Sequence, residues 1–358
     1  MKKIAIKSYN GVYDVTLLNR INFSVKKSDR RKKLILIDSH VYSLYKTRLK
    51  KLVETYPTLL VRANEREKTL IGVEKVLNFL QKSQATKKTI LIGIGGGIIQ
   101  DITTFVSNIF YRGIEWNYYP TTLLSMSDSC IGAKCGINFN KFKNQIGVFH
   151  PPKKVVIFRE FLSTLREKDI LSGYGEILKL SIMDSNKTYS ELLSCLNKYG
   201  PNLKPIIKLI HNSLMAKKKI IEKDELETNL RRVLNYGHTF GHALEAATDN
   251  KINHGMAVIW GIDIANFISN QMNMLSEKNF NQLHNIIKKN FPIKYKKQFS
   301  TKKILNLVKK DKKFESNKIN MALLQNPGNI TIKPIKFDKF FFKIVDNYLR
   351  NHNVLHNN

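Results

Sequence analysis

With 358 residues, of which 42% are hydrophobic, the chain is long enough for two domains, which excludes a small module with a single core. No apolar run reaches the ~20 residues that cross a bilayer, and the start lacks the apolar stretch of a signal peptide, so we expect a cytoplasmic protein without a membrane partner. The three scattered cysteines exclude a disulfide framework, and the net charge of +32 is spread in short clusters, which is typical of a solvated surface rather than a nucleic-acid interface.

Apolar runs of strand length alternate with amphipathic stretches in the first part of the chain. A stretch of helical period covers residues 70–81, and the apolar runs cover 33–38, 59–61, 89–93 and 116–119. Such alternation is typical of a parallel sheet whose strands are joined by crossover helices. We therefore predict a Rossmann-like α/β domain with a parallel sheet over residues 1–158.

Two segments that follow these runs are candidates for binding a cofactor. Residues 65–68, Glu-Arg-Glu-Lys, are interpreted either as contacts to the ribose or diphosphate of a nucleotide or as surface charge. Residues 93–97, Gly-Ile-Gly-Gly-Gly, join a strand to a predicted helix that continues past Asp101. Glycines at such a turn let the backbone approach a diphosphate at a helix N-terminus. Because Ile98 replaces the last glycine of the common dinucleotide motif, a purely structural turn stays open.

A third block, residues 111–144, mixes charged side chains with small ones. Lys134 follows Gly132 and Ala133, and Lys143 precedes Asn144. An ammonium group forms strong charge-assisted hydrogen bonds to carboxylate or phosphate, so both lysines are candidate anion donors. Each is also interpretable as an ordinary surface lysine. The prediction of an anion site therefore requires that both lysines lie close together at one site.

The pattern changes to long stretches of helical period near residues 158–160. These stretches include residues 188–198, 205–223 and 256–271. We therefore predict a mainly α-helical second domain over residues 159–358, ending in a loose polar tail from residue 351.

Histidines in the second domain have the spacing of metal ligands. His238 and His242 stand four residues apart on one predicted helix face, and His254 follows at the next turn. Glu176 is an acidic residue among apolar neighbours and is the leading carboxylate. Imidazoles and a carboxylate suit a catalytic zinc with an open position for substrate. Spacing alone does not tell whether His238 or His242 binds the metal.

Together these blocks resemble the dehydroquinate synthase family in order and spacing over nearly the whole chain. The segments that carry the resemblance are Gly95, Gly96 and Gly97 with Asp101, Tyr111-Arg112-Gly113, residues 120–124, Asp128, Gly132-Ala133-Lys134, residues 143–147, residues 175–179, residues 231–242 and His254-Gly255.

The resemblance implies an NAD-binding α/β domain, a helical domain, a catalytic zinc ion (cobalt is a possible substitute) and a homodimer. It implies conversion of 3-deoxy-D-arabino-heptulosonate 7-phosphate, a phosphorylated sugar acid, to 3-dehydroquinate and phosphate in the shikimate pathway of aromatic amino-acid biosynthesis. The implied zinc ligands are Glu176, His238 and His254, and His242 would then face the substrate phosphate.

The resemblance also implies two larger sets of contacts. The residues implied for NAD are Asp38, Glu65, Lys68, Gly95, Gly96, Gly97, Asp101, Thr121, Thr122, Asp128, Lys134 and Lys143. Those implied for the substrate are Arg112, Lys134, Lys143, Asn144, Lys179, Lys217, Arg231, Asn235, His242 and one of the pair Lys312 and Lys313, with Lys313 preferred. Lys134, Lys217 and Arg231 would surround a carboxylate, for which cyclases of sugar phosphates without a carboxylate have no use.

Several positions depart from the usual family pattern. Met256 replaces a glutamate after His-Gly, so a carboxylate near His254 is missing and support for that ligand is expected to be weaker. The other departures are Ala133 and Gln100 for glycines, Gly175 for an alanine and His40 for an asparagine. We expect an active but divergent enzyme. The alternatives are a cyclase of another sugar phosphate, an inactive paralogue, a polyol dehydrogenase of the same architecture and a basic nucleic-acid-binding protein.

Overall fold

The computed structural model describes residues 2–23, 30–140, 142–249, 251–293, 300–310 and 314–351. The chain folds into two compact units. Unit 1 contains Met1–Arg166 and Lys218–Leu226, and unit 2 contains Glu167–Lys217 and Glu227–Asn358. Residues 159–166, which we assigned to the second domain, therefore pack with unit 1. That these units are an NAD-binding domain and a metal-binding domain stays a prediction at this point.

A seven-stranded sheet forms the centre of unit 1, in the order β1-β2-β9-β6-β5-β3-β4. Only β1 runs antiparallel to its neighbour, so the sheet is mixed and mostly parallel. The strands are β1 (Lys2–Ser8), β2 (Gly11–Leu18), β3 (Lys33–Asp38), β4 (Thr58–Val61), β5 (Ile90–Gly95), β6 (Glu115–Pro120) and β9 (Lys154–Phe158).

The four strands predicted from sequence are β3, β4, β5 and β6, and the predicted α/β fold is confirmed. Every residue of β5 is buried, as expected for a strand covered on both faces. Strand β1 is different, because exposed residues (Lys3, Ala5 and Lys7) alternate with buried Ile4 and Ile6 at the edge of the sheet. This alternation made β1 and β2 less visible in the sequence than the continuous apolar runs.

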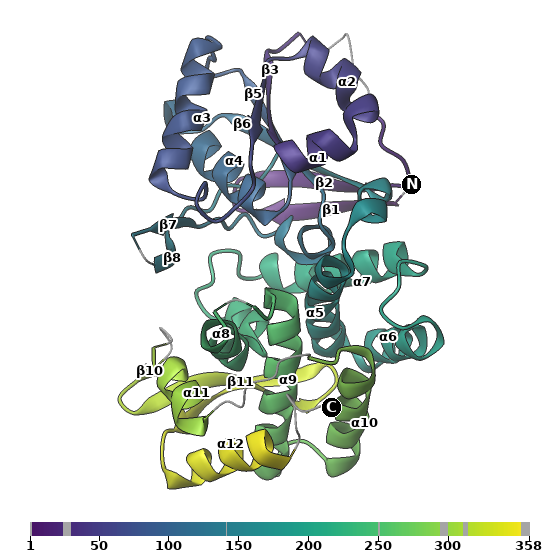
Figure 1. The fold of residues 1–358 in the computed structure, drawn as a ribbon, viewed down its shortest axis with the longest axis vertical. Coiled ribbons are helices and arrows are strands. Elements are labelled where there is room, and N and C mark those ends of the chain that lie inside the picture. The colour runs from purple at the N-terminus through teal and green to yellow at the C-terminus, as the bar shows by residue number, and fades with distance from the viewer. Residues whose placement is uncertain are drawn as a thin grey trace. The chain divides into compact units, whose positions relative to one another are not determined.

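Helices flank this sheet (Figure 1). They are α1 (Ser39–Leu44), α2 (Lys46–Thr55), α3 (Leu70–Lys82) and α4 (Gly97–Ile109), with short helical turns η1 (Phe110–Arg112), η2 (Ser125–Ser129) and η3 (Arg159–Thr164) and a small hairpin of β7 (Ile137–Phe139) and β8 (Phe142–Ile146). Helix α3 begins where the Thr69 side chain accepts a hydrogen bond from the Gly72 amide, and it buries Val73, Val76 and Leu80. The predicted helix over 70–81 is therefore confirmed.

A segment from the middle of the chain completes unit 1. The Lys7 amide of β1 donates a hydrogen bond to Glu222 Oε1 at 2.7 Å, and Ser8 Oγ donates to Glu225 Oε2 at 2.7 Å. Both carboxylates belong to the stretch Lys218–Leu226, which follows a part of unit 2. The edge strand β1 is thus bonded to residues more than two hundred positions later in the chain.

Unit 2 is mostly helical, as predicted. Its helices are α5 (Glu167–Asp184), α6 (Asn186–Tyr199), α8 (His238–Ala247), α9 (His254–Gln271), α10 (Glu277–Asn290), α11 (Thr301–Val308), α12 (Lys339–Asn351) and most of α7 (Ile206–Ile221), with the turn η4 (Leu230–Asn235). Helix α9 lies at the centre, where it contacts α5, α8, α10 and α12 (Figure 1). Because it is surrounded, α9 is buried on nearly every side from Gly255 to Ser269.

An antiparallel sheet in unit 2 was not predicted. Its strands are β10 (Phe314–Glu315), β11 (Lys318–Asn326) and β12 (Asn329–Lys336). The predicted polar tail falls mostly on residues 352–358, which lie outside the described residues. Among the helices that the structure describes, none combines the length and the apolar composition that crossing a bilayer requires.

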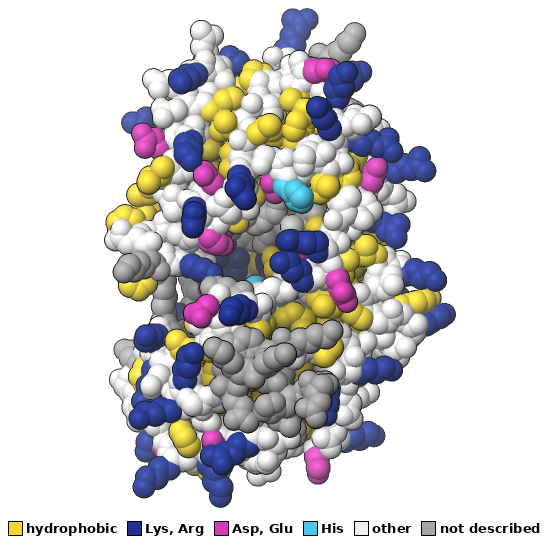
Figure 2. Space-filling model, viewed as in Figure 1, with side chains coloured by type: hydrophobic (Ala, Val, Ile, Leu, Met, Phe, Trp, Pro, Cys, Tyr) yellow, Lys and Arg dark blue, Asp and Glu magenta, His cyan; other side chains and the backbone are white. Residues whose placement is uncertain are grey.

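Figure 2 shows how the excess of positive charge is distributed on one face of the molecule. Lys and Arg side chains are scattered across this face, with Asp and Glu side chains between them. The described surface salt bridges, such as Lys3 with Asp14 and Arg31 with Glu115, involve well-exposed partners. Exposed pairs of this kind add little to stability, and scattered charge of this kind is typical of a solvated surface.

Candidate cofactor and metal sites

The residues predicted to contact a cofactor follow the carboxyl ends of four adjacent parallel strands. Asp38 ends β3 and Gly95 ends β5, while Glu65 and Lys68 come after β4 and Thr121 and Thr122 come after β6. From β3 the chain continues to β4 on one side, and from β5 it continues to β6 on the other. The order of the strands therefore reverses between the neighbouring strands β3 and β5. Open α/β sheets bind their ligands at the carboxyl end of such a topological switch point.

The glycines at the end of β5 and at the start of α4 are of two kinds. A Cβ on Gly93 would lie 2.6 Å from Thr103 Oγ1, and one on Gly95 would lie 2.4 Å from Ile99 Cγ1, so both let α4 pack closely on β5. A Cβ on Gly97 would meet nothing within 4 Å. Gly97 is the first residue of α4, where backbone N–H groups favour an anion. The helix N-terminus therefore has open space beside its first residue.

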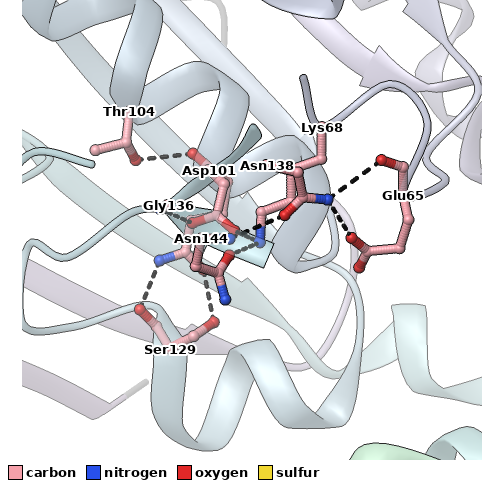
Figure 3. Close-up of polar contacts among 9 residues, drawn as sticks. Glu65, Lys68, Asp101, Thr104, Ser129, Gly136, Asn138 and Asn144 are labelled. Atoms are coloured by element: carbon pink, nitrogen blue, oxygen red, sulfur yellow. Dashed lines mark hydrogen bonds and ion pairs between the residues drawn. The ribbon is translucent and has the colours of Figure 1, made fainter. Parts of the chain in front are cut away.

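A buried ion pair lies beside this turn (Figure 3). Lys68 Nζ is 2.5 Å from Asp101 Oδ2 and donates a hydrogen bond to Asn144 Oδ1 at 2.7 Å. The Gly136 amide donates to Asp101 Oδ1 at 3.2 Å. Burial raises the pKa of Asp101, and the Lys68 ammonium opposes this rise. Through Asn144 and Gly136, the pair of Lys68 and Asp101 links α4 to the β7–β8 hairpin and to the residue before it.

Asn138 is a member of this network that the sequence analysis missed (Figure 3). Its Oδ1 accepts a hydrogen bond from the Asn144 amide at 3.0 Å, and its Nδ2 donates to Glu65 Oε2 at 2.7 Å. Its own amide donates to the Lys68 carbonyl at 2.8 Å. Asn138 therefore joins Glu65, Lys68 and Asn144. Its place six residues before Asn144, across a tight hairpin, was the available signal.

Two departures from the family pattern in unit 1 differ in their structural effect. Gln100 donates through Nε2 to the Ser129 carbonyl at 2.6 Å and accepts from Ser129 Oγ at 2.6 Å, which ties α4 to the turn that carries Asp128. Ala133 stands at φ 59°, in the left-handed region. An alanine there costs about 1–2 kcal/mol that a glycine avoids.

The remaining predicted anion-binding residues of unit 1 are exposed. Lys134 pairs with Phe149 in an isolated bridge, Lys143 lies in β8, and Arg112 ends η1. Tyr111 and Arg112 both have a left-handed backbone conformation, and the carbonyl of each accepts a hydrogen bond from Lys87 Nζ, at 2.8 and 3.2 Å. Lys313, the last predicted substrate contact, lies outside the described residues.

In unit 2, Glu176, His238 and His254 come together from three helices. One possible ligand atom of each lies within 4.8 Å of the others. Glu176 Oε1 is 3.3 Å from His254 Nε2 and 3.6 Å from His238 Nε2. The Nδ1 atom of His238 is 3.2 Å from the Tyr236 carbonyl, so when it donates there the Nε2 lone pair faces Glu176. His242 is one turn further along α8, with its ring centroid 5.4 Å from that of His238.

Burial and charge set the protonation of these groups. Burial raises the pKa of Glu176, but the Lys179 ammonium, which is paired with Oε2, and His254 hold it well below its usual range. Burial and the Lys179 charge lower the pKa of His238 well below its usual value. Burial lowers the pKa of His254, but hydrogen bonds to Glu176 and Glu245 outweigh this and raise it to about 10. An ionised carboxylate beside a neutral imidazole is a donor set that fits zinc.

Close packing between α5 and α9 brings Glu176 and His254 together. A Cβ on Gly175 would lie 2.3 Å from the Gly255 carbonyl oxygen, and one on Gly255 would lie 1.8 Å from the Ser172 carbonyl oxygen. Asn253 caps α9 by accepting from the Met256 amide, and its Nδ2 donates to the Lys168 carbonyl. The first turn of α9 therefore lies so close to α5 that neither Gly175 nor Gly255 has room for a side chain.

Replacing Gly175 by alanine, the usual family residue, is expected to destabilise this protein by about 1–3 kcal/mol and to weaken metal binding. The added methyl group would push Gly255, and with it His254, away from Glu176. Urea unfolding and a competition assay with a metal chelator measure the two effects. The stability control is Gly97→Ala, whose methyl group meets nothing within 4 Å. Wild-type stability and metal affinity in the Gly175→Ala variant would contradict the expectation.

The other residues predicted to contact the substrate are also in unit 2. Lys179 in α5 keeps 2% of its surface exposed, Lys217 in α7 and Arg231 in η4 keep 5% each, and Asn235 ends η4. Buried cationic side chains are uncommon and mark functional sites when they cluster. The structure places Lys179 against the Glu176 carboxylate.

Comparisons with known proteins agree with this architecture. The family model for the 3-dehydroquinate synthase N-terminal region matches residues 58–172, and the model for the C-terminal region matches residues 173–314. The 3-dehydroquinate synthase of Pelagibacter ubique (strain HTCC1062) is 35% identical, over 91% of this chain and 92% of that protein.

Solved structures of sugar-phosphate cyclases share the fold. A 2-deoxy-scyllo-inosose synthase complexed with carbaglucose-6-phosphate, NAD⁺ and Co²⁺ has a TM-score of 0.84 and 23% identity, covering 98% of this chain and 99% of that one. The 2-epi-5-epi-valiolone synthase of Streptomyces hygroscopicus subsp. jinggangensis 5008, with NAD⁺ and Zn²⁺ bound, has a TM-score of 0.83 and 23% identity, covering 94% and 96%. From the family models and the curated relative, the chain belongs to the 3-dehydroquinate synthase family.

Proposed function

We infer that this protein is a 3-dehydroquinate synthase, a lyase that converts 3-deoxy-D-arabino-heptulosonate 7-phosphate to 3-dehydroquinate and phosphate. The observation that carries the inference is the Glu176, His238 and His254 cluster in a chain that aligns almost end to end with a curated synthase. The fold alone does not select this substrate, because cyclases of other sugar phosphates share it.

We propose that Glu176, His238 and His254 hold a zinc ion, with cobalt as a substitute. A metal held by these three side chains would supply Lewis acidity toward a substrate oxygen. The Lys179 ammonium keeps the Glu176 carboxylate ionised at neutral pH. His238 stays neutral because burial and the Lys179 charge disfavour its protonated form. Glu176 and His238 are therefore in the protonation state that metal binding needs, and His254 has to release a proton when the metal binds.

We propose that NAD binds along the carboxyl edge of β3, β4, β5 and β6. The residues assigned to it are Asp38, Glu65, Lys68, Gly95, Gly96, Gly97, Asp101, Thr121, Thr122 and Asp128, with Lys134 and Lys143 beside them. Bound there, NAD would supply reversible hydride transfer, which leaves the reaction without a net redox change. The open space at Gly97 and the helix N-terminus behind it support a diphosphate at this place.

The substrate carries two anionic groups, and the chain offers cationic residues for each. We assign the carboxylate to Lys134, Lys217 and Arg231, and the phosphate to His242, Arg112 and Lys313 with Lys143 and Asn144 nearby. Lys179 and Asn235 complete the proposed contacts. Cationic and hydrogen-bonding side chains of this kind orient a substrate with two anionic groups and stabilise charge that develops as phosphate leaves. A homodimer is proposed from family membership and is testable by light scattering.

Phosphate release from 3-deoxy-D-arabino-heptulosonate 7-phosphate with NAD tests the proposal. The purified protein is assayed as isolated, after chelation and after readdition of zinc. We expect activity that chelation removes and zinc restores, without accumulation of NADH. A glucose 6-phosphate control, which lacks the carboxylate, should give no product. Turnover of that control in place of the sugar acid would identify another cyclase, and no turnover despite bound zinc and NAD would identify an inactive paralogue.

A further inference from the structure

The side chain of Glu245 contacts a proposed metal ligand from a helix that does not carry that ligand. Its Oε2 lies 3.1 Å from Nδ1 of His254. Glu245 belongs to α8, the helix that also carries His238, whereas His254 begins α9. Both side chains are sheltered, with 16% of Glu245 and 34% of His254 exposed. We propose that Glu245 is a positioning residue that holds the His254 ring in the orientation and tautomer that metal binding needs.

The two nitrogens of His254 have different partners. Nε2 lies 3.3 Å from Glu176 Oε1, inside the proposed ligand cluster, and Nδ1 faces Glu245. A neutral imidazole that offers Nε2 to a metal carries its proton on Nδ1, and a carboxylate that accepts this proton fixes the tautomer and strengthens the ligand. His238 uses the Tyr236 carbonyl for the same purpose. Each imidazole of the cluster therefore has its own acceptor.

This contact answers the question raised by Met256. The family usually has a glutamate there, and its loss predicted weak support for His254. Met256 is 6% exposed and packed in the buried face of α9, while the carboxylate beside His254 comes from Glu245. The predicted absence of a carboxylate near His254 is therefore wrong. Glu245 was missed because its spacing of seven residues from His238 indicates only that both residues lie on the same face of one helix. The spacing does not indicate a contact with a histidine on the next helix.

Glu245 is itself near enough to take part in a metal site. One ligand atom from each of His242, Glu245 and His254 lies within 4.8 Å of the others. The hydrogen bond that His254 Nδ1 donates to Glu245 Oε2 accounts for the closeness of two of these three atoms. A positioning residue and a direct ligand differ in measurable ways, because removing a ligand changes the coordination of the ion and removing a positioning residue changes mainly its affinity.

The experiment measures zinc affinity by chelator competition in protein free of NAD and substrate, so it depends on the metal site of the proposed function but not on its reaction. The variants are Glu245→Ala and the isosteric Glu245→Gln. The control is Glu191→Gln, which removes a carboxylate of unit 2 that pairs with Lys208 and Asn212. We expect zinc to bind ~10–100-fold more weakly in Glu245→Ala, less weakly in Glu245→Gln, and unchanged in the control. The visible absorption of the cobalt form should keep its wild-type band pattern in Glu245→Gln.

Undiminished zinc affinity in both Glu245 variants would overturn the proposal. A changed cobalt spectrum with loss of binding as complete as in a Glu176 variant would also overturn it, because Glu245 would then be a ligand. Met256→Glu supplies a further test, since we expect it to give no gain in affinity. Tighter binding in that variant, together with no effect at Glu245, would return the supporting role to position 256. Wild-type protein that binds zinc but releases no phosphate would contradict the proposed function and leave this inference standing.

Discussion

Replacing Glu176 by alanine is expected to abolish metal binding and to lower turnover by ~10³-fold or more, which corresponds to the several kcal/mol that a bound Lewis acid contributes. Glu176 provides the anionic atom of the ligand cluster, with Oε1 within 3.6 Å of both imidazoles. Its removal also leaves the buried Lys179 ammonium without its carboxylate, so we expect a loss of stability of about 3–5 kcal/mol. Metal analysis, phosphate release and urea unfolding measure the three effects.

A double variant separates the two consequences of losing Glu176. In Glu176→Ala with Lys179→Met no buried ammonium is left, so much of the lost stability should return. The metal should stay absent, because the carboxylate ligand is still missing. Full zinc content in the single variant would exclude Glu176 as a ligand. Equal stability of the single and double variants would show that the ion pair with Lys179 is not what the fold depends on.

Replacing Lys68 by methionine is expected to destabilise the protein by about 3–5 kcal/mol and to weaken NAD binding. The side chains of Lys68 and Asp101 are only 10% and 17% exposed, so the Asp101 carboxylate would be left in a poorly solvated place with the Gly136 amide as a remaining donor. Asn144 would lose a hydrogen bond as well. Urea unfolding and titration with NAD provide the measurements.

The matched control for Lys68 is a lysine one turn into α3. Lys75 pairs with Glu67 at 3.0 Å, but its side chain is 58% exposed, so Lys75→Met should cost less than about 1 kcal/mol. In Lys68→Met with Asp101→Asn the uncompensated carboxylate is gone, and part of the stability should return. Similar losses of stability in Lys68→Met and Lys75→Met would show that burial does not increase the contribution of the Lys68–Asp101 ion pair to stability.

The central strands were predictable from sequence because covering a strand on both faces leaves a continuous apolar run. Strand β3 spans the predicted residues 33–38, and β5 begins one position after its predicted start. Strands β1 and β2, with one face toward solvent, and the β10–β12 sheet, in a region of helical composition, have no such signal. Those strands form because they pair with distant segments of the chain, and a local sequence pattern does not indicate such pairing.

The candidate metal site was predictable in its residue types but not in its arrangement. The spacing of His238 and His242 puts both on one face of α8, and only the packing of α5 and α9 shows that His238 faces Glu176 and His254. That packing depends on glycine contacts such as Gly175 with Gly255, which are tertiary. Met256 was interpreted as the loss of a carboxylate and Gln100 only as a departure from a glycine. The residues that explain them, Glu245 beside His254 and Ser129 beside Gln100, come from other segments.

The stretch Lys218–Leu226 has a consequence for how the protein is made. The edge strand β1 is synthesised first, yet its hydrogen-bond partners Glu222 and Glu225 leave the ribosome only after a long part of unit 2. During that interval the Lys7 amide and the Ser8 hydroxyl at the edge of the nascent sheet are without these carboxylate acceptors. Unit 1 is therefore complete only after residue 226 has been synthesised, although most of its residues precede unit 2 in the chain.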